Sequence, residues 1–194
     1  MAPQFRTVRP ARTALTTTAA LALLLSVGLG TATARPVGPF DVGGAIEVEY
    51  DQVGGPGALG DPTAPEADAA NGGRYQTFER NASIYWHPGT GANAVGGAIR
   101  DKWGAYGWES GPLGFPLTDE AAARADNGRY NLFPGGAIYW SPRSGAHVVW
   151  GAIRDLWVSN GAESGRYGFP TGEEYDYQGG KAQDFQGGRI TWQP

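Results

Sequence analysis

The sequence predicts an α+β fold: three tandem repeats of about 54 residues, each a short helix, a structured loop and a β-hairpin, packed as one repeat domain. A Leu-Gly-x-Pro phrase starts at Leu59 and Leu113 and returns as Tyr-Gly-Phe-Pro at Tyr167. Gly-Ala-Ile precedes every phrase and Ile-x-Trp follows it, so all landmarks keep one register. The three repeats cover approximately residues 43–95, 96–149 and 150–194.

Each repeat is expected to begin with a helix of two to three turns. Ile99 and Trp103 are four residues apart and therefore share one helix face, and repeat three keeps this spacing. Gly107 is expected to end the helix in a left-handed conformation. In repeat one, Ile46 and Tyr50 keep the helical spacing, but the segment Ile-Glu-Val-Glu-Tyr also alternates as a strand does. A strand is therefore the alternative in repeat one.

The phrase and the segment after it predict a loop and a hairpin. Leu113 and Phe115 are apolar and precede a proline that favours extended backbone, so we expect them to plug the core between helix and hairpin. Two β-rich runs, 129–133 and 137–140, flank a Pro-Gly-Gly turn and predict the hairpin. A unit this small cannot bury its own apolar face, so neighbouring repeats are expected to pack on one another.

The first 34 residues are typical of a secretory signal peptide. Three arginines precede an uncharged stretch whose apolar part is shorter than the ~20 residues of a membrane span. Ala32-Thr33-Ala34 fits a small-x-small cleavage site. An uncleaved anchor is the alternative. We therefore expect a signal peptide over 1–34 and the repeat domain over 35–194, with no membrane span after cleavage.

Composition narrows the classes of partner. The leader contains three of the 15 basic residues and none of the 19 acidic ones, so the net charge changes from −4 to −7 on its removal. Nucleic acid and anionic lipid need a basic surface, so neither is expected as a partner. The chain has no cysteine, and His87 and His147 do not have metal-ligand spacing, so no metal or cofactor is expected.

Repeated carboxylates are the one catalytic possibility. A glycosidase needs two carboxyl groups about 5–10 Å apart in one cleft, whereas the acids here occur once in each unit. Acids spaced in this way suit a structural task, such as accepting backbone amides or pairing with Arg74, Arg129 or Lys181. The acids concerned are Glu66, Glu120 and Glu174 after each phrase, and Glu109 and Glu163 in Glu-Ser-Gly.

Aromatic residues are the better binding candidates. Strand alternation places Ile138 and Trp140 on one face and Tyr139 on the other. We expect the tryptophans of this motif to pack in the core, and Tyr139 to face outward, where it can stack on sugar rings. Trp108 has no counterpart in the other repeats and is expected to be exposed in a glycine-rich loop. The candidate ligand-binding residues are Trp108, Tyr85, Tyr139, Arg74 and Arg129.

Leu-Gly-Phe-Pro at this period, with Gly-Ala-Ile before it and Ile-Tyr-Trp after it, resembles the LGFP repeat family over nearly all of residues 43–194. The resemblance implies a secreted actinobacterial protein held at the cell wall through peptidoglycan or arabinogalactan. Family repeats often follow an amidase or a mycoloyltransferase domain, and no such domain is recognised in this sequence. Asp61 replaces the phenylalanine in repeat one, and Tyr167 replaces the leucine in repeat three.

Residues and resemblance together predict a non-catalytic secreted module, associated with the cell wall. It would bind cell-wall polysaccharide, anchoring to or maintaining the cell envelope. One alternative is a cell-wall hydrolase or transferase that uses the repeated carboxylates. The other is a protein-binding or inhibitory module that acts on a secreted enzyme.

Overall fold

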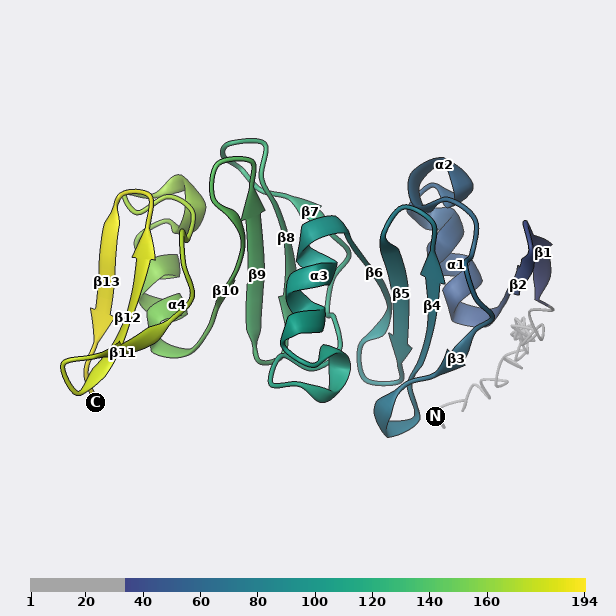
Figure 1. The fold of residues 1–194 in the computed structure, drawn as a ribbon, viewed down its shortest axis with the longest axis horizontal. Helices are drawn as coiled ribbons and strands as arrows, with labels where there is room; N and C mark the ends of the chain where they lie inside the picture. The colour runs from purple at the N-terminus through teal and green to yellow at the C-terminus, as the bar shows by residue number, and fades with distance from the viewer. Residues whose placement is uncertain (1–33) are drawn as a thin grey trace, which may run out of the picture. The chain divides into compact units, whose positions relative to one another are not determined.

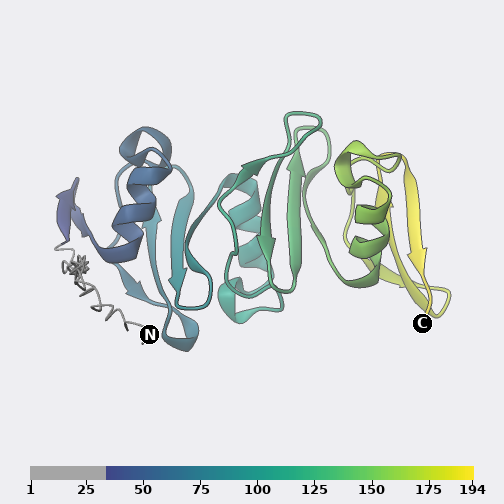
Figure 2. The same cartoon turned by 180° about the vertical axis from the view of Figure 1, so that it is seen from behind.

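The computed structural model describes residues 34–194 and confirms three α+β repeats, in which helices alternate with small antiparallel sheets (Figure 1, Figure 2). The expected leader, residues 1–34, lies outside the described residues except for Ala34. No helix within residues 34–194 is both long enough and apolar enough to cross a membrane.

A nine-residue helix begins each repeat as predicted, including repeat one, where the strand alternative is wrong. Ile99 and Trp103 are buried on one face of the second helix, and Gly107 follows it in the left-handed region with φ 89°. A short helix comes next in repeat one and a 3-10 turn in the other two. The helices are α1 (Gly44–Gln52), α2 (Gly55–Leu59), α3 (Gly97–Ala105) and α4 (Gly151–Ser159), and the turns are Trp108–Ser110 and Ala162–Ser164.

Each predicted hairpin is part of a larger antiparallel sheet, preceded by an N-terminal hairpin β1 (Arg35–Val37) and β2 (Phe40–Val42). Strand order follows chain order in every sheet. The first sheet contains β3 (Ala67–Asp68), β4 (Arg74–Phe78), β5 (Ala82–His87) and β6 (Gly91–Gly96). The second contains β7 (Ala121–Ala122), β8 (Arg129–Phe133), β9 (Gly136–Ser141) and β10 (Gly145–Val149). The third contains β11 (Tyr175–Tyr177), β12 (Gly180–Phe185) and β13 (Gly188–Trp192).

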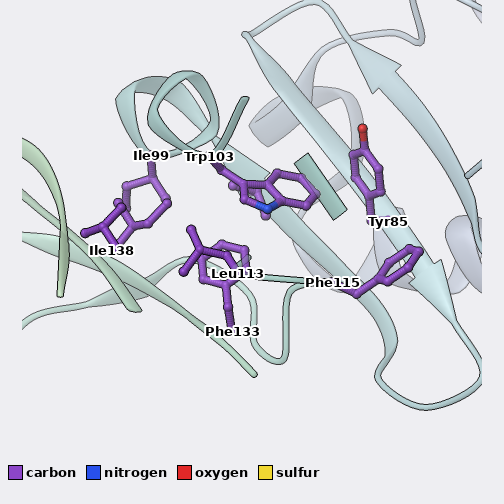
Figure 3. Packing of buried hydrophobic residues seen from close by; sticks show 9 residues of the cluster. Tyr85, Ile99, Trp103, Leu113, Phe115, Phe133 and Ile138 are labelled. Carbon is purple, nitrogen blue, oxygen red and sulfur yellow. The ribbon is translucent and has the colours of Figure 1, made fainter. Parts of the chain in front are cut away.

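Helix α3 packs against two sheets at once. Its Ile99 and Trp103 share one hydrophobic cluster with Tyr85 of the first sheet and with Phe133 and Ile138 of the second (Figure 3). Helix α4 likewise contributes to a cluster that contains residues of the second and third sheets. The first two sheets are therefore covered on both faces, so both alternating sets of side chains on their strands are buried.

The phenylalanines of the second and third phrases pack on the repeat before their own. Phe115 lies 6.3 Å from Tyr85 between ring centroids, and a Cβ added to Gly73 would be 2.5 Å from its ring. Gly128 provides the same space for Phe169. The expectation that the phrase joins helix to hairpin inside one repeat is thus incomplete, because its aromatic ring connects successive repeats.

Buried amides also tie each sheet to the strand before its helix. Asn131 donates through Nδ2 to the carbonyl of Ala94 at 3.0 Å, and Gln183 donates through Nε2 to that of Val148 at 2.7 Å. Gln76 makes the matching bond to Asp41 of β2 at 3.0 Å. All three amide side chains are fully buried. Each amide nitrogen donates to two backbone carbonyls, while the amide oxygens have no partner among the described residues. The bonds from the nitrogens set how the repeats align.

Candidate functional site

Each sheet places a tryptophan directly opposite a basic residue. These two residues are register partners on adjacent antiparallel strands, so their side chains emerge on the same face of the sheet. The face is the one toward the repeat's own helix. The pairs are Arg74 with Trp86, Arg129 with Trp140, and Lys181 with Trp192.

In repeat two, this pair lines a groove of about 400 Å³ beside the first turn of α3. Glu120 lies in the same groove, with its Oε1 3.9 Å from the Nε of Arg129. Burial raises the pKa of Glu120, and the charge of Arg129 acts in the opposite direction. An indole, a half-exposed guanidinium and a carboxylate thus meet in one recess.

Repeat three has the matching groove, of about 440 Å³, beside the first turn of α4. Trp192, Lys181 and Glu174 take the places of the residues in repeat two. Trp192 is 39 % exposed, which makes it one of the most exposed large apolar residues described. Lys181 pairs with Asp176 rather than with Glu174, so the ion pair expected there is replaced by another. We call these two recesses the Trp–base–Glu grooves.

In repeat one the basic residue, Arg74, forms two ion pairs, whereas Arg129 and Lys181 form one each. Arg74 donates from Nε to Glu66 at 2.7 Å and pairs with Asp68 as well. The expected pairing of Arg74 with Glu66 is therefore confirmed, as is that of Arg129 with Glu120 at the longer distance. Because carboxylates already accept from Arg74, it has fewer free donors than Arg129.

Tyr85 and Tyr139 do not face outward, so the predicted exposure is wrong. They are 6 % and 8 % exposed. Each makes an edge-to-face contact with the tryptophan of the next helix: the ring centroids lie 4.6 Å apart for Tyr85 and Trp103, and 4.7 Å apart for Tyr139 and Trp157. Burial raises the pKa of Tyr139 to about 12. The alternation of Tyr139 and Trp140 along β9 agrees with the prediction. The tyrosine is buried because the next helix covers the face of the sheet that was expected to be open.

The tryptophans at the strand ends are correspondingly less buried than predicted. Trp140 is partly buried and Trp192 is exposed, although both were expected in the core. They lie at the ends of strands, where the helix no longer covers the sheet completely. The aromatic surface available to a ligand is therefore the tryptophan of each motif rather than its tyrosine.

Trp108 is also more confined than a loop residue would be. Its indole meets the edge of Trp103 at 5.4 Å and lies 5.0 Å from the guanidinium carbon of Arg100. A Cβ added to Gly104 would be 2.5 Å from the indole, so the glycine makes room for the ring. Trp108 is half-buried, which corrects the predicted exposure.

Two of the repeated acids have structural partners. Glu109 accepts the amide of Ala70 at 3.1 Å, and Glu163 accepts that of Arg124 at 3.0 Å. Both amides belong to the preceding repeat, which matches the structural task expected for acids repeated along the chain. Within residues 34–194, no three His, Cys, Asp or Glu side chains are grouped to hold a metal ion.

His87 ends β5, whereas His147 lies in the middle of β10. His87 stacks on Phe115, with ring centroids 4.7 Å apart, and its Nδ1 accepts the amide of Gly89. His147 contacts Glu173 through Nδ1 at 3.0 Å. Both therefore have local partners in the described part of the chain.

The grooves combine features suited to hydroxyl-rich rings. An indole face packs on the apolar side of a sugar, while basic and acidic side chains donate to and accept from its hydroxyls. Of the predicted site residues, Arg129 lies in a groove and Arg74 at the matching position. The sequence prediction missed Trp140, Trp192, Glu120 and Glu174 as groove residues, although their recurrence in one register was visible.

Fold and grooves define a repeat protein that presents one type of recess more than once. The model of the LGFP repeat family matches residues 59–111, 113–165 and 168–194. These matches cover more than half of the chain, which therefore belongs to the LGFP repeat family. No curated protein is significantly similar to the chain.

Proposed function

We propose that the chain is a non-catalytic, secreted module that binds cell-wall polysaccharide and so anchors to or maintains the cell envelope. The observation that carries the proposal is the cross-strand pair of tryptophan and basic residue, which recurs beside a carboxylate at the start of α3 and α4. The wall as target, with arabinogalactan or peptidoglycan as the polymer, follows from the resemblance to the family.

Repetition favours a polymeric ligand. Two weak sites on one rigidly packed chain hold a polymer much longer than either site alone, because the second contact forms at high effective concentration. The acidic net charge of the chain is compatible with a neutral glycan. Glu109 and Glu163 already accept backbone amides, which leaves fewer carboxylates for catalysis.

The test is co-sedimentation of residues 35–194 with purified wall sacculi. Trp140→Ala and Trp192→Ala should each weaken binding several-fold, and the double variant should abolish it, since each removes the stacking surface of one groove. Val48→Ala changes an exposed apolar residue on α1 and serves as the matched control. Competition with soluble arabinogalactan or peptidoglycan fragments then identifies the polymer.

Two results would overturn this proposal. The wall-binding function fails if the wild-type chain does not sediment with sacculi, or if the double variant sediments equally well. Release of soluble fragments from labelled wall polymer by pure protein would instead support the hydrolase or transferase alternative. Capture of a secreted enzyme that survives excess free glycan would support the inhibitory module.

A further inference from the structure

The Trp–base–Glu groove of repeat two continues into a second recess. A cavity of about 290 Å³ lies where repeat one meets repeat two, and we call it the Arg80 recess after the arginine in its lining. Gly96, Gly97 and Glu120 line both this recess and the groove. A Cβ added to Gly97 would have no described atom within 4 Å, and one added to Gly96 would meet Oε2 of Glu120 at 3.6 Å. The backbone between the two recesses is therefore open, and the recesses form one continuous groove.

Repeat three closes the equivalent passage with two aromatic rings. The residue before the helix is Gly96 in repeat two and Trp150 in repeat three, and both have extended backbone. The residue after the preceding helix is Val53 in the first case and Tyr106 in the second. The rings of Tyr106 and Trp150 pack edge to face, with centroids 5.5 Å apart. The space that is open between repeats one and two is therefore filled between repeats two and three.

The lining of the Arg80 recess combines apolar and charged side chains. Val53, Leu59 and Ala82 provide apolar surface from repeat one. Arg80 is exposed, so its guanidinium can donate hydrogen bonds to a ligand, and Glu120 can accept one. A ligand in this recess therefore meets a donor, an acceptor and an apolar surface together.

The donor occurs at only one of the two places where described repeats meet. Arg80 lies in the turn between β4 and β5, where Phe78 pairs with Ala82 across three residues. The corresponding turn of repeat two is Pro134-Gly135, which is one residue shorter and contains no arginine. The arginine and the open passage thus occur together, beside the groove of repeat two.

An acetamido group matches this lining. Its methyl group packs on apolar side chains, its carbonyl oxygen accepts from a guanidinium, and its N–H donates to a carboxylate. A sugar hydroxyl can bond to the two polar groups, but it has no methyl group to place on the apolar surface. A sugar with an acetamido group therefore uses the whole lining, whereas an unsubstituted sugar uses part of it.

We propose that repeat two binds at least two consecutive residues of an N-acetylated amino-sugar polymer. One ring packs on Trp140 in the groove, and the acetamido group of a neighbouring residue enters the Arg80 recess. This inference rests on the proposed wall-polysaccharide function and narrows it. It favours peptidoglycan, whose glycan strand consists of N-acetylated amino sugars, over arabinogalactan, whose arabinose and galactose units carry no acetamido group.

The test is isothermal titration calorimetry of residues 35–194 with two tetrasaccharides that differ in this group alone. Chitotetraose carries an acetamido group on every ring, and cellotetraose carries a hydroxyl group instead. We expect chitotetraose to bind about tenfold more tightly, because it gains one buried methyl group and one hydrogen bond. Equal affinities, or no binding of chitotetraose at millimolar concentration, would overturn the inference.

A double variant closes the passage without disturbing the backbone. Gly96→Trp with Val53→Tyr rebuilds the arrangement of repeat three, and φ at these positions is −132° and −81°, which any residue adopts. The variant should lose the preference for chitotetraose. A preference that persists at an unchanged melting temperature would exclude the Arg80 recess as the site of the acetamido group.

A single variant tests the donor at an exposed position, where folding is not at risk. Arg80→Met should weaken chitotetraose binding several-fold and leave cellotetraose binding nearly unchanged. Arg143→Met replaces another exposed arginine, in the turn between β9 and β10, and is the matched control. Equal affinity for chitotetraose in Arg80→Met and in the control would overturn the role given to Arg80.

Failure of this inference differs from failure of the proposed function. A chain that sediments with sacculi but binds both tetrasaccharides equally would retain the wall-binding function and exclude the acetamido site. A chain that prefers chitotetraose but does not sediment with sacculi would do the reverse.

Discussion

The first junction, between repeats one and two, and the second junction, between repeats two and three, place different charges at one pair of positions. Glu49 on α1 corresponds to Lys102 on α3, and Asp119 after the second phrase corresponds to Glu173 after the third. Asp119 accepts the amide of Ala94 at 2.8 Å, while Glu173 accepts that of Val148 at 3.1 Å. The backbone contact is therefore the same, and only the partner from the helix differs.

The second junction surrounds its carboxylate with donors. Lys102 lies 2.7 Å from Glu173, and the hydroxyl of Tyr106 and the ring of His147 each lie 3.0 Å from it. Burial alone would raise the pKa of Glu173. Hydrogen bonds from His147, Lys102 and the amide of Val148, with the charge of Lys102, lower it to about 2 instead.

The first junction brings two acids together. Glu49 is only 7 % exposed, and its Oε1 is buried without a partner among the described residues. Burial, followed by the hydrogen bond and the charge of Asp119, raises the pKa of Glu49 to about 8. Arg80 and Glu120 line the recess next to Asp119. The carboxyl group of Glu49 therefore keeps its proton at neutral pH.

This difference gives the junctions opposite responses to pH. The pKa of Glu173 is below its ordinary value, so its contribution is complete above about pH 4.5 and is lost as the pH falls toward 2. The pKa of Glu49 is above its ordinary value, so the first junction is most stable below about pH 4.5 and loses stability as the pH rises to 8. The same backbone arrangement thus holds an ionised carboxylate at the second junction and a protonated one at the first.

The largest effect is expected from the aromatic packing that both junctions share. Tyr139→Ala should cost about 3–5 kcal/mol, because it empties a buried site against Trp157 and Tyr130. Tyr85→Ala should cost the same at the first junction, which would confine the difference between junctions to their charges. Urea unfolding measures both, and a nearly unchanged midpoint for Tyr139→Ala would restore the outward orientation predicted from the sequence.

The next effect comes from giving the second junction the charges of the first. Lys102→Glu removes the cation beside Glu173 and adds a second acid, so we expect a loss of about 2–4 kcal/mol at pH 7. The loss should shrink near pH 4.5, where one of the acids gains a proton. A loss that does not change with pH would mean that Lys102 contributes packing rather than charge.

A smaller effect of opposite sign is expected at the first junction. Glu49→Gln removes the group that must lose its proton, and it should stabilise the chain by about 1–3 kcal/mol at pH 8 and hardly at all at pH 4.5. Asp155→Asn, an exposed change on α4, is the control. Thermal unfolding across this pH range measures both. An equal gain at both pH values would contradict the raised pKa of Glu49.

The smallest effect on stability is expected in a groove. Trp192→Ala should cost about 1 kcal/mol, because the indole is 39 % exposed. Its loss of wall binding should be much larger than its loss of stability. The reverse ratio would make Trp192 a packing residue rather than a ligand contact.

The sequence predicted the parts of the fold that rest on local spacing. Ile99 with Trp103 located the helix, and the runs around Pro134 located the hairpin. The strand Gly91–Gly96 was not predicted, because its alternation of small and polar residues resembles a loop. It is a strand because β5 offers a free edge beside it.

The candidate site was harder to predict, since it depends on what covers each face of a sheet. Period-two alternation separates Tyr139 from Trp140, but it does not say which face meets another repeat. The exchange of Lys102 for Glu49 is visible when the repeats are aligned. The contact of Glu49 with Asp119, about 70 residues away in the sequence, depends on the fold.

The contact between each phenylalanine ring and a glycine of the preceding repeat fixes the order in which repeats can follow one another. A repeat with Phe115 or Phe169 can only follow one that offers a glycine such as Gly73 or Gly128. Repeat one carries Asp61 instead of the phenylalanine, whereas repeat three keeps a glycine at Gly180 but replaces the stacked tyrosines with Ala182 and Thr191. Only the middle repeat has both the phenylalanine and the complete site, a glycine beside two stacked tyrosines, that receives the phenylalanine of the next repeat. Duplication of this repeat would therefore lengthen the protein without changes at either end.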